Sequence, residues 1–397
     1  MIQLKRLRIR NFKSIKEIDF KFNHLNMLIG MNGAGKSTIL QSLDFISQLM
    51  HGNISDWLIS RDWKSVDLSC KLLKESNIEI EVEACLNNSE YIIWSANFNR
   101  STLKCTNEKI KVNGEDAYVV KSRDIHLTVM KDINDLEENH TKIVLKYPNL
   151  FNYEGSLLSK LELKNINLKF AYADQLVQFK DFIKSIKSLE LLAPHLMRKS
   201  TRSNTDNYVG IGGEKLSSYL FSLNEEQNQR LIGFLKNFYP NIISFTTKNQ
   251  RSGWKKLIIE ESNSLINIEH EARHINDGLL RILAILAQLE STPSFLMLDE
   301  IENGINQEII EKLVNVLIES KTQLLITTHS PLVLNYLPDN IAIESVVYIY
   351  KSVDGSTNNK PFFEIDHIKE KLEIMGVGDA VLDTNLIELN NELNSLG

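Results

Sequence analysis

The most specific chemical signal in the sequence is a glycine-rich segment that ends in lysine and serine. Residues 30–37 read Gly-Met-Asn-Gly-Ala-Gly-Lys-Ser and match the pattern G-x-x-x-x-G-K-[ST]. Glycines let backbone N–H groups close around a phosphate, and the N-terminus of a following helix favours its negative charge. We expect Lys36 to reach the β- and γ-phosphates of a nucleotide and the Ser37 hydroxyl to ligate Mg²⁺. The predicted nucleotide-binding residues of this segment are Gly30, Asn32, Gly33, Ala34, Gly35, Lys36, Ser37 and Thr38.

Two carboxylates after a short apolar run would supply the rest of this chemistry. Phe295–Leu298 is followed directly by Asp299 and Glu300, and ligands bind at the carboxyl ends of strands in α/β sheets. We expect Asp299 to hold Mg²⁺ together with Ser37, and Glu300 to polarise the attacking water as the general base. An apolar strand that ends in Asp-Glu is by itself a common solvated strand end, so this interpretation depends on the phosphate-binding segment.

A histidine follows the next apolar run. Leu325–Thr328 precedes His329, one strand–helix unit after Asp299 and Glu300. A histidine at a strand end is usually an ordinary loop residue, but this spacing favours an imidazole that reaches the γ-phosphate. Lys36, Glu300 and His329 are therefore the predicted catalytic residues.

Alternating and helical periodicities give the elements that must position these residues. Apolar and charged residues alternate over 6–10 and 78–83, and Asn113-Gly114 is a hairpin signal, so we expect an antiparallel sheet through about residue 130. A short apolar strand over 27–29 runs directly into Gly30, and apolar spacings of three and four predict a helix from Ser37 to Met50.

The later segments change from helical to mixed patterns. Residues 156–240 are predicted to be mostly helical, with one apolar stripe formed by Phe179, Phe182, Ile183, Ile186 and Leu189. Strands are expected over Lys256–Glu260 and Leu265–Glu269. The last third alternates strands and helices, which favours a parallel sheet, and it ends with a sheet edge over Val346–Tyr350 and a helical tail.

Composition excludes several classes of protein. With 397 residues, 43% of them hydrophobic, the chain has material for two or three globular domains, and its net charge of −6 excludes a polybasic coat for nucleic acid. The longest apolar stretch, Leu279–Leu289, is too short to span a bilayer, and the N-terminal residues form no signal peptide. Three isolated cysteines indicate neither disulfides nor a zinc site. We therefore expect a cytoplasmic protein with no membrane contact.

These motifs together resemble the SMC/RecF-like branch of the ABC-type ATPases, often labelled "AAA family ATPase". Residues 9–15 resemble the opening of that branch, 298–305 its Walker B motif and D-loop, and 328–331 its H-loop. The resemblance extends to stand-alone members similar to the ATPase half of OLD-type and related bacterial antiviral proteins. It implies an α/β P-loop NTPase of ABC-type head architecture, whose mixed sheet carries an antiparallel β lobe and a mostly helical insertion.

The resemblance also divides the chain and locates a second nucleotide-binding segment. It implies an N-terminal ATPase lobe over 1–100, a β-hairpin and helical insertion over 101–260, and a C-terminal ATPase lobe over 261–397. Asn276, Asp277 and Gly278 occupy the place of the signature motif, where the family usually carries serine instead of Asn276.

Two further positions depart from the family or admit two interpretations. The glutamine of the family's Q-loop is missing, because no Gln occurs between Gln48 and Gln175, so Asp62 or another polar group would have to replace it. Arg281, on an otherwise apolar helix, either pairs with a buried carboxylate or contacts the nucleotide site.

The resemblance implies a homo-oligomer in which two ATP molecules, with Mg²⁺, lie between two chains. The favoured function is an ATP-hydrolysing switch subunit that controls a separate effector, such as a nuclease, in bacterial antiviral defence. The chain has 66 residues after Pro331, which we expect to be too few for a nuclease domain of its own. The alternatives are a RecF-type ATPase that clamps DNA, and an ATP-bound scaffold with little turnover.

Two basic runs, over 195–202 and 248–256, could contact a DNA backbone. The arginines at 6, 8 and 10 are a third basic group. For each of these groups the favoured interpretation is a solvated face or loop. We also expect the region over about 100–260, and not the nucleotide core, to carry the surface for a partner or DNA.

Replacement of Lys36 by alanine tests the phosphate-binding assignment directly. Lys36→Ala removes the only side-chain cation of the loop, so we expect the variant to lose ATP binding. Titration with a fluorescent ATP analogue measures this loss, and binding as tight as that of the parent protein would show that the site is assigned wrongly.

Overall fold

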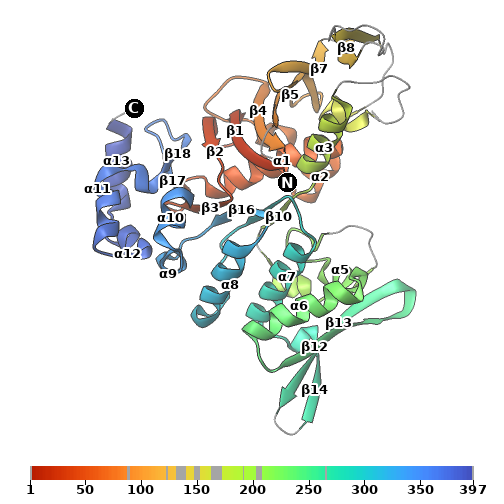
Figure 1. The fold of residues 1–397 in the computed structure, drawn as a ribbon, viewed down its shortest axis with the longest axis vertical. Helices are drawn as coiled ribbons and strands as arrows, with labels where there is room; N and C mark the ends of the chain where they lie inside the picture. The colour runs from red at the N-terminus through yellow and green to blue at the C-terminus, as the bar shows by residue number, and fades with distance from the viewer. Residues whose placement is uncertain are drawn as a thin grey trace.

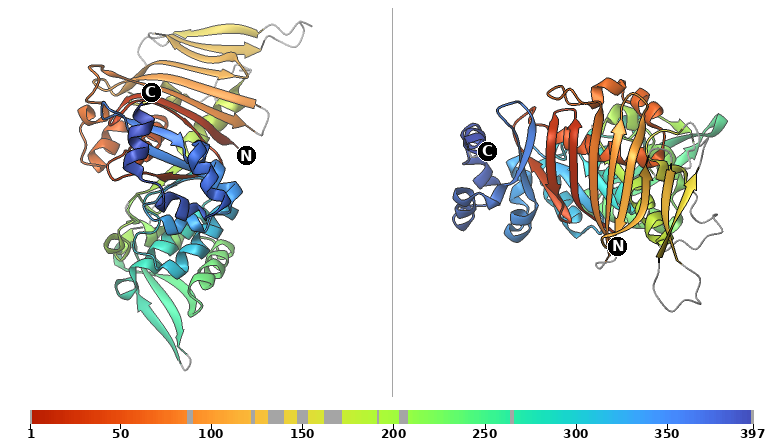
Figure 2. Two further views of the ribbon diagram at one scale, coloured as in Figure 1. Left: turned by 90° about the vertical axis from the view of Figure 1, so that its left-hand side faces the viewer. Right: turned by 90° about the horizontal axis from the view of Figure 1, so that it is seen from above.

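The computed structural model describes residues 2–86, 90–121, 124–130, 140–146, 153–161, 172–190, 192–202, 208–263 and 266–395. Their strands form three sheets (Figure 1). An antiparallel sheet lies at one end of the molecule, a mainly parallel sheet lies in the middle, and a small antiparallel sheet projects at the other end (Figure 2). No described helix is long and apolar enough to cross a membrane.

The large antiparallel sheet has eight strands in the order β2-β1-β4-β5-β6-β7-β8-β9. Its alternating pattern is the one predicted: Leu7 and Ile9 are buried, whereas Arg8 between them is exposed. Asn113 and Gly114 join β6 to β7 with φ of 48° and 90°, the left-handed pair that a type I′ hairpin requires. The strands are β1 Gln3–Phe12, β2 Ile15–Lys21, β4 Asn77–Leu86, β5 Glu90–Asn99, β6 Lys104–Val112, β7 Glu115–Lys121, β8 Asp124–Met130 and β9 His140–Lys146.

The central sheet has the order β10-β15-β16-β3-β17-β18, and only its last pair is antiparallel. Its strands are β3 Leu25–Ile29, β10 Ile186–Leu189, β15 Phe295–Leu298, β16 Gln323–Thr327, β17 Val346–Lys351 and β18 Thr357–Pro361. The predicted strands at 27–29, 295–298 and 324–327 are confirmed. Two expectations are wrong in this sheet.

The predicted helical stripe ends before Ile186, because Ile186–Leu189 is strand β10. This four-residue segment has an apolar residue at each end, a pattern that fits a short strand and a helical turn equally well. Its pairing with β15 makes it a strand. The second error concerns β17, which is not the sheet edge. The polar strand β18 pairs outside it, although its sequence carries no apolar pattern.

The third sheet belongs to the segment between β10 and the last third of the chain. It contains β11 Thr201–Arg202, β12 Ile242–Asn249, β13 Trp254–Asn263 and β14 Ile266–Glu271. The two predicted strands are confirmed as β13 and β14, although Leu265 lies outside the described residues. Strand β12 was not predicted, because its second half is polar. The basic run over 248–256 spans the end of β12, the connection Arg251–Gly253 and the start of β13.

The helices cover both faces of the central sheet, as the strand–helix rhythm predicted. They are α1 Lys36–His51, α2 Ile54–Ser60, α3 Ala173–Lys184, α4 Pro194–Met197, α5 Leu216–Ser222, α6 Glu225–Phe238, α7 Asp277–Glu290, α8 Gln307–Glu319, α9 Pro331–Asn335, α10 Asp339–Ser345, α11 Asp366–Lys369, α12 Val377–Leu382 and α13 Leu386–Ser395. The helical tail is confirmed as α11–α13, and Figure 1 shows these helices together beside β17 and β18.

The central sheet separates two hydrophobic cores. Phe295 and Met297 of β15 point into the core that also contains α1, α3 and the antiparallel sheet. Leu296 and Leu298 point into the core that contains α6, α7 and α8. Strand alternation therefore places one strand between two packed layers. The division of the chain into three domains remains a prediction, and β10 pairs with β15 across its second boundary.

Glu108 on β6 is a buried carboxylate in the first core. It accepts hydrogen bonds from Ser156 Oγ and Leu157 N, both at 2.6 Å, and thereby ties a short helical turn to the sheet. Burial nevertheless raises the pKa of Glu108 from 4.5 to about 7. The folded protein therefore holds a proton that the unfolded chain releases, so stability falls as pH rises from about 4.5 to about 7.

Glu108→Gln should remove this pH dependence because an amide does not titrate. Between pH 4.5 and pH 8 we expect the variant to gain up to about 3 kcal/mol in unfolding free energy relative to the parent. Urea unfolding at both pH values measures the change, with exposed Glu115→Gln as the control. A constant difference between variant and parent at both pH values would contradict the expectation.

Candidate nucleotide-hydrolysing site

The phosphate-binding segment forms a tight loop between β3 and α1. Gly35 is the N-cap of α1 with φ of 112°, and no side chain caps the helix. The first N–H groups of a helix have no partner within the helix. They are therefore available to a phosphate at the positive end of α1.

Lys36 is almost completely buried, with 6% of its surface exposed. Its Nζ donates to the carbonyl oxygen of Gly30 at 2.8 Å and lies 3.5 Å from His329 Nδ1. Burial lowers the pKa of Lys36 to about 8, against the opposing effect of Asp299 and Glu300. A nucleotide phosphate would stabilise the charged ammonium far better than a carbonyl does.

Ser37 and Asp299, the predicted metal pair, lie together. Ser37 Oγ donates to Asp299 Oδ2 at 3.2 Å, and the Thr327 hydroxyl donates to Asp299 Oδ1. Burial raises the pKa of Asp299. A hydroxyl and one carboxylate suit Mg²⁺, which keeps several waters and nucleotide oxygens as its other ligands. The described residues contain no cluster of three or more His, Cys, Asp or Glu side chains that could hold a metal ion.

Glu300 and His329 lie beside Lys36. We call these three predicted catalytic residues the catalytic row. The backbone of Glu300 is left-handed, with φ of 47°, and its N–H donates to Thr327 Oγ1 at 2.8 Å. Such strain at a non-glycine residue is typical of functional sites. The Glu300 carboxylate lies 3.7 Å from His329 Nε2, while the other ring nitrogen of His329 faces Lys36. The structure therefore brings Lys36, His329 and Glu300 together.

Glu302 is a site residue that the sequence did not reveal. Its carboxylate accepts hydrogen bonds from His329 N at 2.6 Å and from Thr328 Oγ1 at 2.9 Å. One side chain thus joins the turn after β15 to the turn after β16. The only available signal was an acidic residue two positions after Glu300.

A buried charge network lies beside Asp299. Glu190 directly follows β10, and Asp299 N donates to the carbonyl oxygen of Leu189 at 3.2 Å. Arg61 donates to Glu190 and to Asp44 of α1 at 2.9 and 2.6 Å. Glu190 also raises the pKa of Asp299.

Asp62, one expected substitute for the missing glutamine, makes no hydrogen bond or ion pair with Ser37 or Asp299 among the described residues. That residue is exposed on the turn after α2. Glu190 is the polar residue beside the metal pair, because β10 ends at the same sheet edge as β15.

The signature segment begins helix α7. Asn276 caps the helix by accepting from Leu279 N at 2.8 Å, and Asp277 pairs with Arg198. Within the described residues, the hydrogen bonds and ion pairs of this segment do not reach the phosphate-binding loop. The assignment of Asn276–Gly278 to a nucleotide therefore stays a prediction.

Arg281 lies in the second turn of α7 and lines a small cavity together with Asp299 and Glu300. Its Nε is buried without a hydrogen-bond partner among the described residues. Burial lowers the pKa of Arg281, whereas Asp277 and Glu300 oppose this effect. Of the two interpretations of Arg281, its position favours the nucleotide site.

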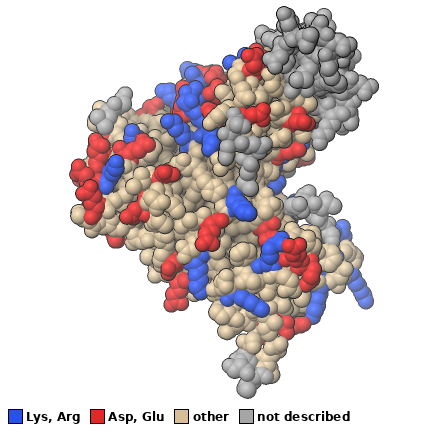
Figure 3. All heavy atoms as spheres, viewed as in Figure 1, with Lys and Arg blue, Asp and Glu red and all other residues tan. Residues whose placement is uncertain are grey.

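Several members of the basic groups pair with neighbouring carboxylates. Lys248 pairs with Glu269 at 2.7 Å, and Lys256 pairs with Glu271 at 2.5 Å. Lys255 is buried, and its Nζ lies 3.4 Å from the centre of the Phe221 ring. Arginines of β1 pair with acidic residues of β2 and β4. Figure 3 shows basic and acidic side chains interspersed on the viewed face, which favours solvated, ion-paired surfaces over a phosphate-binding stripe.

Comparisons with known proteins identify the family of the chain. A family model described as "AAA domain, putative AbiEii toxin, Type IV TA system" matches residues 51–335. The chain is 24% identical over 346 residues to a Helicobacter pylori protein named ATP/GTP phosphatase, covering 82% of this chain and 84% of that protein. It is 22% identical over 286 residues to the DNA replication and repair protein RecF of Leptospira biflexa, covering 71% and 67% of the two chains.

A solved structure shares the fold. The Smc head domain of Pyrococcus furiosus, bound to the C-terminal domain of ScpA, is similar with a TM-score of 0.55 at 10% identity. The match covers 94% of this chain and all of that chain. The fold class predicted from the sequence is confirmed.

Glu302→Gln should slow turnover because glutamine has one acceptor oxygen in place of two. Either the His329 N–H or the Thr328 hydroxyl then loses its acceptor. The backbone of the turn after β16 is held less firmly, and the His329 ring with it. We expect kcat to fall about tenfold, as a lost hydrogen bond to a charged group implies, with KM for ATP changed less than twofold. Steady-state phosphate release measures both constants. Glu308→Gln, on the exposed side of α8, is the control, and an unchanged kcat in Glu302→Gln would contradict the role of Glu302.

Proposed function

Because the chain belongs to the "AAA domain, putative AbiEii toxin, Type IV TA system" family and is an SMC/RecF-like ABC-type ATPase, we propose that it is a nucleotide-controlled switch subunit. Two chains associate around ATP, hydrolysis separates them, and the change is transmitted to a separate effector protein. This proposal depends on how the predicted site residues are distributed. Lys36, Ser37, Asp299, Glu300 and His329 lie together on one chain, whereas Asp277 of the signature segment pairs with Arg198 and not with these residues.

The side chains of this site have distinct roles in the proposed hydrolysis. Lys36 neutralises charge on the phosphates, and the Glu300 carboxylate accepts a proton from the attacking water. His329, between them, orients the terminal phosphate and the carboxylate. Mg²⁺, held by Ser37 and Asp299, would stabilise negative charge on the phosphate oxygens.

Asn276–Gly278 of the second chain would close the site. The amide of Asn276 and the N-terminus of α7 can donate to a terminal phosphate, and Asp277 is exposed. This arrangement makes ATP part of the interface, so nucleotide state and association are coupled.

The effector is proposed to be a protein, such as a nuclease, that acts in bacterial antiviral defence. The family description names a toxin, and Lys248 and Lys256 of the β12–β13 hairpin and Arg6 of β1 are paired with carboxylates. The similarity to RecF supports a second candidate, an ATPase that clamps DNA. ATP-dependent retention of DNA by a hydrolysis-deficient variant would favour that candidate.

Glu300→Gln tests the association step. The variant keeps the metal pair but lacks the base, so hydrolysis should fall by roughly 10²–10⁴ and the ATP-bound dimer should accumulate. Sedimentation with and without ATP measures the mass. The double variant with Lys36→Ala should stay monomeric because it lacks nucleotide. An unchanged mass of Glu300→Gln in saturating ATP would refute the proposed sandwich.

A further inference from the structure

The β17–β18 hairpin packs against both ends of the phosphate-binding loop. A Cβ atom on Gly30 would lie 2.1 Å from the carbonyl oxygen of Ile349 in β17, and one on Gly35 would lie 2.1 Å from Thr357 Oγ1 in β18. These distances are far below van der Waals contact. Strands about 320 residues away in sequence therefore define the space that the loop occupies.

Thr357 makes the polar contact of this hairpin with the loop. Its side chain is completely buried, and Oγ1 donates to the carbonyl oxygen of Ala34 at 2.9 Å. Lys351 Nζ donates to the same Oγ1 at 3.0 Å, which directs the hydroxyl proton towards Ala34. The Thr357 backbone N–H donates to the carbonyl oxygen of Ser14 at 2.8 Å.

This contact determines the direction of an N–H group that a phosphate would use. The carbonyl of Ala34 and the N–H of Gly35 belong to one planar trans peptide unit, so they point in opposite directions. With the carbonyl held by Thr357 on the outer side, the Gly35 N–H points to the inner side of the loop. Loss of the hydroxyl would free this peptide to rotate, because the glycine permits both orientations.

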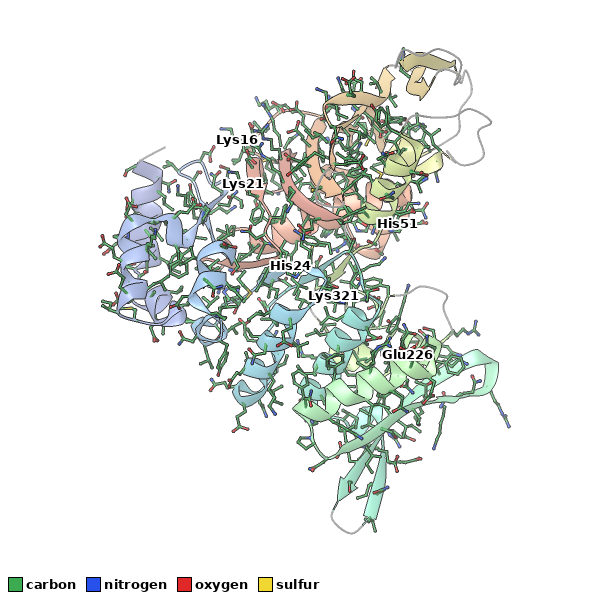
Figure 4. All side chains as sticks on the ribbon, viewed as in Figure 1. Lys16, Lys21, His24, His51, Glu226 and Lys321 are labelled. Atoms are coloured by element: carbon green, nitrogen blue, oxygen red, sulfur yellow. The ribbon has the colours of Figure 1, made fainter. Side chains whose placement is uncertain are left out.

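Further bonds hold the hairpin in place. Ser14 Oγ lies 2.8 Å from Thr357 Oγ1 and 3.1 Å from Thr38 Oγ1, so the network reaches the first turn of α1. At the hairpin turn, Asp354 pairs with Lys16 of β2 at 3.1 Å, and Figure 4 labels Lys16 on this side of the antiparallel sheet. Asn394 of α13 donates to the carbonyl oxygen of Lys351 at 3.1 Å.

We propose that Thr357, directed by Lys351, is a positioning residue for nucleotide binding that fixes the Ala34–Gly35 peptide with its N–H towards the phosphates. Thr357 does not touch the nucleotide itself. A change at Thr357 should therefore act mainly on nucleotide affinity, because its hydrogen bonds are with Ala34, Lys351 and Ser14. None of these bonds goes to Lys36, Glu300 or His329.

Thr357→Val tests this proposal because valine keeps the volume and branching but removes the hydroxyl. We expect KM for ATP and the dissociation constant of a fluorescent ATP analogue to rise about 5- to 20-fold, with kcat within threefold. Thr357→Ser restores the hydroxyl and should return both constants to within twofold of the parent. Thr322→Val, directly before the amino end of β16, is a matched control for the loss of a buried threonine hydroxyl.

Lys351→Met gives an independent measurement if Thr357→Val does not fold. It keeps most of the side-chain stem and removes the ammonium, and we expect a 3- to 10-fold rise in the same two constants. Circular dichroism establishes that each variant is folded. A folded Thr357→Val or Lys351→Met with both constants within twofold of the parent would overturn the proposal, as would a loss confined to kcat.

Discussion

Parallel pairing in the central sheet is the constraint on which the site depends. The registers Leu189 with Leu298, Leu298 with Ile326, and Thr327 with Leu28 align the carboxyl ends of four strands. The polar residues that follow each strand therefore lie together at the carboxyl-terminal edge of the sheet. Residues that are hundreds of positions apart, such as Ser37 and Asp299, meet because backbone hydrogen bonds allow no slippage between these strands.

This alignment places several charges in a region with little water. Burial lowers the pKa of Lys36 and raises the pKa of Asp299, because both charged forms lose contact with water. The network of Arg61 with Glu190 and Asp44 shows how costly buried charges are compensated by close partners. A nucleotide phosphate and its metal would satisfy the remaining charges, which makes the site a strong electrostatic receptor for both.

Two side chains connect the strand ends to each other and to the rest of the chain. Glu302 links the turns after β15 and β16, and Thr357 links the phosphate-binding loop to the C-terminal hairpin. Beyond that hairpin, Asn394 connects it to helix α13. The predicted phosphate-binding loop is thus supported from three directions: the antiparallel sheet through Ser14, the central sheet, and the C-terminal helices.

The sequence by itself determined the phosphate-binding segment, the carboxylates at Asp299 and Glu300, and the histidine at His329. Each consists of neighbouring residues whose spacing has a direct chemical meaning, and the strands and helix beside them carry clear periodicity. Only the tertiary structure decided that Ile186–Leu189 is a strand, because a four-residue apolar pattern is ambiguous until a neighbour pairs with it. Glu190, Glu302 and Thr357 were likewise invisible, since a glutamate or threonine has no local signature of the distant group that it binds. Long-range pairing brings these groups within hydrogen-bond distance, and that distance gives them their roles.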